Sequence, residues 1–414
     1  MQEAQRGIRP QAGRVSEALP SPRLGVALGG IGALALLGWV ILSGQGLAQG
    51  ILFGLGALLG VALYHARFGF TAAFRQLMAV GQGRGLRAHM LMLAVASVIF
   101  APLLAAGTGF LGGNVSGYVA PIGVSVVVGA FLFGIGMQLG GACASGTLYT
   151  VGGGQTTILF TLAGFVGGSV LGAWHWGFWT QDAFNWREVS LADTSFGYPG
   201  AVVLQLAVIG AIVLATVVIS RRRRPPKPAR QPSASGVARA VRGTWPLWVG
   251  AVALAGLNAA VLYVSGSPWG VTGAFALWGS KIAAAAGVDV ASWTYWSGDN
   301  AAALESSILA DVTTATNFGI ILGALVAAAV GGSFVVHRRV PLKTVVAAIA
   351  GGILMGYGAR LAYGCNIGAY FGGVASFSLH GWLWAVMALL GTYGGLKLRP
   401  LFGLLVPKPR DGSC

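Results

Sequence analysis

Two cysteines are the residues of this chain best placed to do chemistry, because they occupy the same position in a repeated glycine-rich segment. Residues 134–146 read Gly-Ile-Gly-Met-Gln-Leu-Gly-Gly-Ala-Cys-Ala-Ser-Gly, and residues 356–368 read Gly-Tyr-Gly-Ala-Arg-Leu-Ala-Tyr-Gly-Cys-Asn-Ile-Gly. The two segments align without a gap and pair Cys143 with Cys365. Since the chain holds only three cysteines, this register is not expected by chance.

Both segments interrupt long apolar stretches. A glycine-rich break at membrane depth leaves backbone groups that lipid cannot satisfy, so it must line a cavity or be buried in protein. Paired breaks at corresponding places of two repeats point to the substrate site of a transporter. We therefore expect both segments to line a substrate path. The residues assigned to this path are Cys143, Cys365, Gly134, Gly136, Gly146, Gly356, Gly358, Gly364, Asn366, Gly368, Arg360, Gln138 and Ser145.

The composition predicts what kind of protein must position these residues. Hydrophobic residues make up 55% of the chain, charged residues only 9%, and the mean hydropathy is +0.75. A soluble protein carries about 25% charged residues. Residues 88–181 contain no Asp, Glu, Lys or Arg, and one membrane span needs about 20 apolar residues. The chain is therefore expected to be an all-α polytopic membrane protein.

The net charge of +16 does not indicate nucleic-acid binding in such a chain. The basic residues cluster beside apolar stretches, which is the pattern that sets membrane topology. The cysteines are far apart and show neither CxxC nor a zinc-type Cys/His spacing, so no disulfide framework, metal site or cofactor is expected. Cys414 is interpreted as an incidental tail residue.

Ten membrane crossings are predicted from the apolar stretches. They lie at 24–43, 47–64, 88–107, 119–138, 156–175, 199–220, 245–264, 312–335, 342–360 and 379–396. Starting from a cytoplasmic N-terminus, this order places every Lys/Arg cluster on the same side of the membrane. The tails 1–23 and 397–414 and the basic linker 221–243 are then cytoplasmic, and the loops 176–198 and 265–305 are external. The Trp residues of the external segments are expected to form an interfacial belt.

The crossing directions predict an internal symmetry. The span before Cys143 runs from outside to inside, and the span before Cys365 runs the opposite way. A second pair of similar segments, Gly-Phe-Thr-Ala-Ala-Phe at 69–74 and Gly-Val-Thr-Gly-Ala-Phe at 270–275, fits the same relation. We expect two inverted four-helix repeats with broken helices at the motifs, a known transporter plan. The repeats would span 47–175 and 245–396, with a linking helix at 199–220 and an extra N-terminal helix at 24–43.

These motifs, together with Gly-Cys-Asn-Ile-Gly at 364–368 and Arg-Phe-Gly-Phe-Thr-Ala-Ala-Phe-Arg at 67–75, give the chain a family resemblance. Over about 47–396 it resembles the YeeE/YedE family of sulfur-compound transporters. The resemblance implies import of thiosulfate or a related sulfur species across a bacterial inner membrane. It also carries the family's substrate-path cysteines over to Cys143 and Cys365. The chain departs from the family at Ala142, where glycine is common, and at Gly69, where some members have a cysteine.

The residue types fit this implied function. A thiol is a weak hydrogen-bond donor on a polarizable atom, so it suits the terminal sulfur of thiosulfate. Backbone N–H groups at the helix breaks favour an anion. The alternative is that both cysteines are small packing residues, since free cysteine is often buried. Arg360, aligned with Gln138, either attracts the anion or extends its side chain to the membrane interface. Tyr363 is a further polar lining candidate.

Four functions remain open at this stage. The first is a permease for thiosulfate or a related sulfur anion, and the second is a transporter of sulfide or a selenium species. The third is an intramembrane thiol redox protein, which would need a vicinal cysteine pair rather than two single thiols. The fourth is a subunit that delivers sulfur to a soluble cytoplasmic sulfur-carrier protein. Unless it is the thiol redox protein of the third hypothesis, the chain is not expected to be an enzyme. Its expected partners are the sulfur anion and the lipid bilayer.

Overall fold

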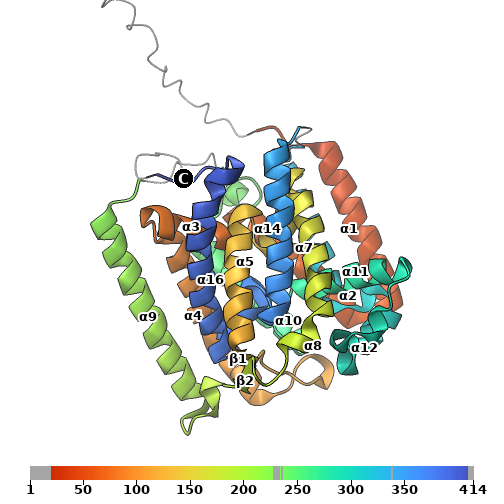
Figure 1. Ribbon diagram of the computed structural model, residues 1–414. Helices are drawn as coiled ribbons and strands as arrows, with labels where there is room; N and C mark the ends of the chain where they lie inside the picture. Colours follow the sequence, from red (N-terminus) through yellow and green to blue (C-terminus); the bar gives the residue numbers. More distant parts are fainter. Residues whose placement is uncertain (1–19, 227–233, 235, 337–338, 409–414) are drawn as a thin grey trace, which may run out of the picture.

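The computed structural model describes residues 20–226, 234, 236–336 and 339–408. The N-terminal tail up to residue 19, part of the basic linker and Cys414 lie outside the described residues. The described chain forms a bundle of helices with one small pair of strands, and Figure 1 shows α5, α14 and α16 side by side near its centre.

The elements of the first half are α1 (Leu24–Gln45), α2 (Leu47–Ala66), α3 (Phe70–Val80), α4 (Arg84–Ala106), α5 (Val124–Leu139), α6 (Ala144–Gly152), α7 (Thr157–Trp174), α8 (Trp176–Trp179) and α9 (Gly197–Arg223). The second half contains α10 (Leu247–Ser265), α11 (Thr272–Ala285), α12 (Ala301–Glu305), α13 (Val312–Val330), α14 (Leu342–Leu361), the π-helix η8 (Asn366–Gly372), α15 (Gly373–Ala375) and α16 (Leu379–Leu398). Strands β1 (Pro121–Gly123) and β2 (Asn185–Glu188) pair antiparallel.

The prediction of an all-α polytopic membrane protein is confirmed. Nine helical segments in the described part of the chain are long and apolar enough to cross a membrane. Two of these segments combine a long and a short helix, α2 with α3 and α5 with α6. The tenth predicted span is present as the 20-residue helix α16, but it is not among the nine. Its sequence includes His380 and Lys397, which reduce its apolar character.

Two predicted loops contain helices instead. The basic segment after α2 holds α3, and the expected external stretch after α10 holds α11. Both helices are short, with 11 and 14 residues, so a search for spans of about 20 residues passes over them. Their aromatic side chains Phe70, Phe74 and Phe275 are fully buried. The span expected to begin at 119 also differs, because strand β1 precedes α5.

The belt predicted for the Trp side chains is wrong for two of them. Trp269 is 0% exposed and Trp296 is 4% exposed, so both belong to the core. Trp296 donates from Nε1 to Ser280 Oγ at 3.0 Å. The Trp296 indole therefore packs and forms a hydrogen bond inside the protein. The presence of a Trp residue in a polar stretch of the sequence was not enough to predict a position at the membrane interface.

The helices of the two halves pack against one another in matched pairs. Helix α2 packs on α13 and α10 packs on α4, while α7 packs on α14 and α16 packs on α5. Helices α5 and α14 meet at the centre. A Cβ on Gly136 would lie 2.6 Å from the carbonyl oxygen of Gly351, and a Cβ on Gly358 would lie 2.4 Å from that of Gly129. Such close backbone contacts need glycine, as is typical of helix packing in membranes.

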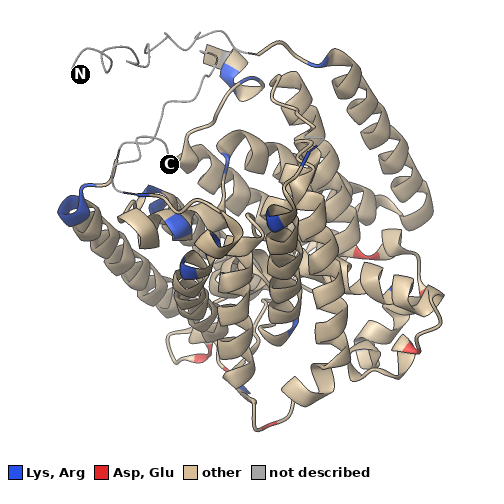
Figure 2. Cartoon of the chain, turned by 45° about the horizontal axis from the view of Figure 1, so that its top comes forward, with Lys and Arg blue, Asp and Glu red and all other residues tan. Residues whose placement is uncertain are grey.

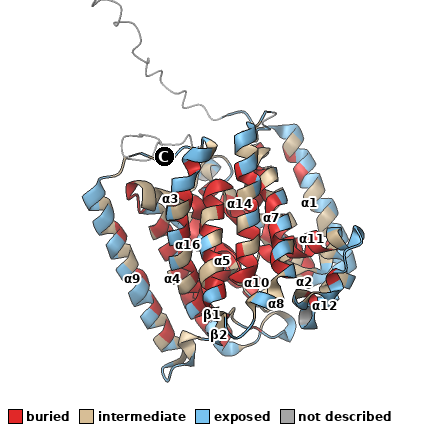
Figure 3. Ribbon diagram, viewed as in Figure 1, coloured by how far each residue is buried: buried red, intermediate tan, exposed pale blue. Residues whose placement is uncertain are grey.

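Burial and charge follow the shape of the bundle. Figure 3 shows the buried residues concentrated in the middle, with α1 and α9 largely exposed at the two sides. Figure 2 shows most Lys and Arg residues toward one end of the bundle and the Asp and Glu residues toward the other. Helices α8 and α12 lie toward the acidic end. The two ends of the helix bundle therefore differ in charge.

Candidate functional site

The two cysteines lie at helix breaks, as the motifs predicted. Helix α5 ends at Leu139 and α6 begins after Cys143, while α14 ends at Leu361 and η8 begins after Cys365. The segments α6 and η8 contact each other. Both thiols are free, and each cysteine is only 1% exposed. The fold thus brings two chain breaks that are distant in sequence into one buried region.

The surroundings of the two thiols differ. Cys143 Sγ lies 3.7 Å from the hydroxyl oxygen of Ser145. At the second break, the backbone N–H of Ile367 donates to Cys365 Sγ at 3.4 Å. The helix that follows Cys143 is an ordinary α-helix, whereas the one after Cys365 is a π-helix, a form that often marks functional positions.

Arg360 is a buried cation next to the second break. The residue is 7% exposed. Its Nη1 donates to the hydroxyl of Tyr295 at 2.5 Å and its Nη2 donates to Thr272 Oγ1 at 2.7 Å. Nε has no hydrogen-bond partner, and none of the described residues offers the guanidinium a carboxylate. Since a buried charge is costly unless it is paired, this arrangement favours an anion nearby.

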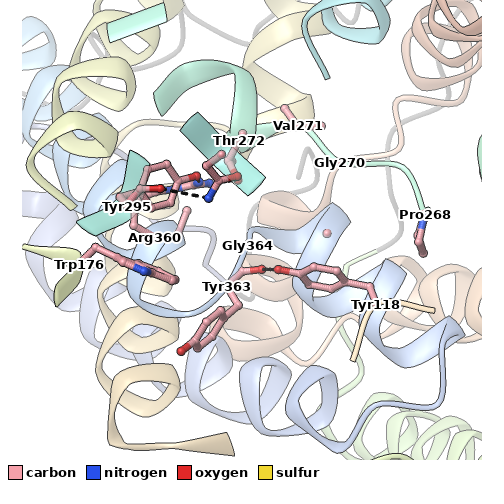
Figure 4. A pocket seen from close by; sticks show the side chains of 14 residues that line it. Tyr118, Trp176, Pro268, Gly270, Val271, Thr272, Tyr295, Arg360, Tyr363 and Gly364 are labelled. Carbon is pink, nitrogen blue, oxygen red and sulfur yellow. Dashed lines mark hydrogen bonds between the residues drawn. The ribbon is translucent and has the colours of Figure 1, made fainter. Parts of the chain in front are cut away.

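A cavity of about 340 Å³ lies against Arg360. Its wall is formed by Tyr118, Trp176, Pro268, Gly270, Val271, Thr272, Gly273, Tyr295, Asn300, Ala359, Arg360, Tyr363, Gly364 and Gly368. Figure 4 shows Arg360 beside Tyr295 and Thr272, with Tyr363 and Gly364 across from them. Because Trp176 belongs to α8, the cavity lies toward the acidic end of the bundle. The cavity combines a cation with hydroxyl donors and aromatic walls.

Hydroxyl groups fix the backbone around this cavity. The Tyr118 hydroxyl donates to the carbonyl oxygen of Tyr363, a contact also visible in Figure 4. Burial raises the pKa of Tyr118 above its ordinary value, although the Arg360 charge acts in the opposite direction. The phenol therefore stays protonated and keeps donating. Tyr363 adopts φ +55°, a left-handed conformation that is uncommon for a residue with a side chain.

The predicted path glycines have two different surroundings. Gly134, Gly136, Gly356 and Gly358 lie at close helix contacts, where an added Cβ would stand within 2.6 Å of a carbonyl oxygen of another helix. Gly364 and Gly368 line the cavity instead, and nothing lies within 4 Å of a Cβ built on Gly368. The last of the predicted glycines, Gly146, lies beside Cys143, with 3.3 Å between its added Cβ and Sγ.

Three of the polar path candidates, Gln138, Ser145 and Asn366, are fully buried. Gln138 donates from Nε2 to the carbonyl of Thr71 at 3.3 Å and is 0% exposed. Ser145 and Asn366 are also 0% exposed. Gln138 therefore contacts the threonine of one Gly-x-Thr segment, and Arg360 contacts Thr272 of the other.

Several residues at the cavity were missed by the sequence reasoning. Tyr118, Trp176 and Tyr295 come from connecting segments, and the motifs gave no reason to single them out. A signal did exist for Thr272. It belongs to the repeated segments at 69–74 and 270–275, whose threonines contact aligned positions of the two cysteine motifs.

Comparison with known proteins identifies the family. The family model for sulphur transport matches residues 65–394. The thiosulfate transporter TsuA of Spirochaeta thermophila is 29% identical over 350 residues, which cover 82% of this chain and 95% of that protein. TsuA of Escherichia coli is 28% identical over 352 residues, which cover 82% and 91%.

A further relative aligns over a shorter stretch. Probable transporter YedE of Salmonella typhimurium is 36% identical over 147 residues, which cover 34% of this chain and 35% of that protein. The chain thus matches about a third of YedE but nearly the whole length of TsuA. These matches confirm the resemblance found from the motifs. The chain is a multi-pass membrane protein that belongs to the sulphur transport family.

Proposed function

We propose that this protein imports thiosulfate, or a closely related sulfur anion, across a bacterial inner membrane. The observation that carries the proposal is Arg360, a buried guanidinium with no carboxylate partner among the described residues, at the wall of a 340 Å³ cavity. An anion entering the cavity would supply the missing negative charge. The names of the two TsuA relatives support thiosulfate as that anion.

In this proposal the anion passes from the cavity to the two thiols. Gly364 and Gly368 line the cavity on either side of Cys365 in the sequence, so that cysteine is the nearer of the two. The contact between η8 and α6 supports a continuation toward Cys143. Each thiol would donate a weak hydrogen bond to the soft terminal sulfur. Weak donors suit a path, because the anion must leave each position as easily as it enters.

In this proposal the charge distribution sets the orientation of the protein in the membrane. The positive-inside rule assigns the Lys/Arg-rich end to the cytoplasm, together with the N- and C-termini. The cavity and Arg360 then face outward, where the anion is captured. We further propose that 47–175 and 245–396 are inverted repeats, with 24–43 as an extra helix and 199–220 as a linking helix. The matched helix pairs and the reciprocal contacts of Gly136 and Gly358 support this division.

Sulfur-source rescue tests the proposed function. The chain is expressed in a bacterium that lacks its own thiosulfate and sulfate uptake, and growth is measured on thiosulfate, sulfate or sulfide as the sole sulfur source. Uptake of ³⁵S-labelled thiosulfate is measured in the same cells. We expect growth and uptake with thiosulfate and no rescue by sulfate. Rescue by sulfate with no uptake of thiosulfate would contradict the proposal.

A further inference from the structure

Asn366 is buried with neither end of its side-chain amide hydrogen-bonded. It is 0% exposed, and Nδ2 and Oδ1 both lack a partner among the described residues. An amide can donate two hydrogen bonds and accept two, so leaving all of them unmade inside a protein destabilises the fold. Such a group in a native structure needs an explanation, and a functional role is one of them.

Two other buried asparagines show the usual situation. Asn258 accepts at Oδ1 from the backbone N–H of Trp269 at 2.8 Å. Asn317 donates from Nδ2 to the carbonyl of Val271 at 2.9 Å. Each of these side chains uses one end of its amide to hold a segment in place. Asn366 holds nothing in this way, so its conformation leaves both ends available to a ligand.

The position of Asn366 connects it with the cavity. It follows Cys365 directly and lies between Gly364 and Gly368, which both line the cavity wall. Cys365, Asn366 and Ile367 between these glycines are buried, next to the cavity-lining residues in the sequence. The aligned residue of the first motif is Ala144, which has no polar side chain. An unpartnered amide therefore follows the thiol directly in the segment between the two cavity-lining glycines.

We propose that Asn366 determines substrate specificity by donating its amide N–H groups to an oxygen of the anion, while the Cys365 thiol donates to its sulfur. This inference rests on the proposed function and adds the selection between sulfur anions. Thiosulfate carries both a terminal sulfur and oxygens. Hydrosulfide has no oxygen for the amide, and sulfate has no soft sulfur for the thiol. The pair therefore selects anions that present both kinds of acceptor.

The test uses the purified full-length chain in proteoliposomes and ³⁵S-thiosulfate uptake, with unlabelled hydrosulfide and sulfate as competitors. Asn366→Leu keeps the approximate volume and removes the donors. We expect the KM for thiosulfate to rise about tenfold, as for a lost hydrogen bond to a charged group. The inhibition constant of hydrosulfide, obtained from uptake over a range of thiosulfate concentrations, should stay at the parental value. Asn366→Ser keeps one donor and should restore part of the affinity.

Asn317→Leu is the matched control, because Asn317 is equally buried but holds a backbone segment. It should lower the thermal stability of the protein and leave the ratio of thiosulfate to hydrosulfide affinity unchanged. A folded Asn366→Leu variant with the parental KM overturns the inference alone, as does a variant that weakens both anions equally. Absence of thiosulfate uptake by the parent protein instead overturns the proposed function.

Discussion

The motif at 134–146 and its counterpart at 356–368 share one scaffold but differ in charge. In each, the fifth position reaches a threonine of a short buried helix: Gln138 contacts Thr71, and Arg360 contacts Thr272. Each cysteine follows at the next helix break. The neutral amide at one position and the cation at the other therefore distinguish two otherwise similar sites.

The two motifs share their backbone packing and differ in the groups that surround the thiol. Glycine contacts of the same kind hold both motifs in place, as Gly136 and Gly358 show. The cation, the cavity and the π-helix accompany Cys365. Under the proposed function, a nearly symmetric framework would present one thiol for capture of an anion and the other for its onward passage.

Removing either thiol should have the largest effect on transport. Cys143→Ala or Cys365→Ala leaves the sulfur of the anion without a donor in a buried region, at a cost of about 1–3 kcal/mol. ³⁵S-thiosulfate uptake should fall by about tenfold to a hundredfold. The double variant should be little worse, since both thiols act on one path, and serine should restore only part of the rate.

Cys414→Ala is the matched control for these variants and should transport normally. Expression is compared by immunoblot, because the fold should tolerate the loss of one sulfur. Parental uptake by a well-expressed Cys143→Ala, Cys365→Ala double variant would show that both cysteines are packing residues.

Arg360→Gln makes the two motifs alike at their fifth position. It removes a charge-assisted contact worth about 1.5–3 kcal/mol, so the KM for thiosulfate should rise at least about tenfold. The maximal rate should change less, because the thiols remain. Arg360→Lys keeps the charge but loses the planar donor geometry and should be intermediate. An unchanged KM across several ionic strengths would exclude a role in capture.

Replacing each of the two central glycines with alanine should show whether their helix contacts are equivalent. Gly136→Ala and Gly358→Ala each place a Cβ less than 3.0 Å from the backbone of the facing helix, so both should lower the thermal stability in detergent by a similar amount. Gly167→Ala is the control, since nothing lies within 4 Å of its added Cβ. It should have no effect or stabilise α7 slightly. A large loss in one variant only would contradict equivalent roles.

Tyr295→Phe should produce the smallest effect. The aromatic ring stays near Arg360, whose Cζ lies 5.6 Å from the ring centroid, but the hydroxyl acceptor is lost. One net hydrogen bond of about 1 kcal/mol corresponds to a change in KM of about fivefold or less. A change as large as that of Arg360→Gln would mean that Tyr295 itself binds the anion.

Sequence reasoning predicted the long helices and both cysteine sites because their signals are local. Apolar stretches of about 20 residues indicate spans, and the aligned glycines and cysteines mark the breaks. Helices α3 and α11 were missed because they are too short for that criterion. Nothing in the spacing of Tyr118, Trp176 and Tyr295 shows that three separate connections meet at one cavity. Their convergence depends on tertiary packing.

Matching residues of the two halves are separated by a nearly constant number of positions, and this offset changes at the π-helix η8. Before it, Gly134 and Gly356 are 222 positions apart, as are Gly136 and Gly358. After it, Gly168 and Gly391, which pack on Ile353 and Phe131, are 223 positions apart.

The next glycine pair shows the same change. Gly172 lies against Arg360 and Gly395 lies against Gln138, and these glycines are also 223 positions apart. The second half therefore holds one more residue than the first between the cysteine motif and its last helix. The backbone N–H of Tyr370 donates to the carbonyl of Cys365 at 3.2 Å, a bond that closes a turn one residue wider than in an α-helix.

This wide turn takes up the additional residue, so the helices on both sides keep their glycine contacts. An additional residue at this position changes the backbone around Cys365 and leaves the glycine contacts of the helices in place. Adaptation of one thiol's surroundings therefore does not require a change in how the helices fold.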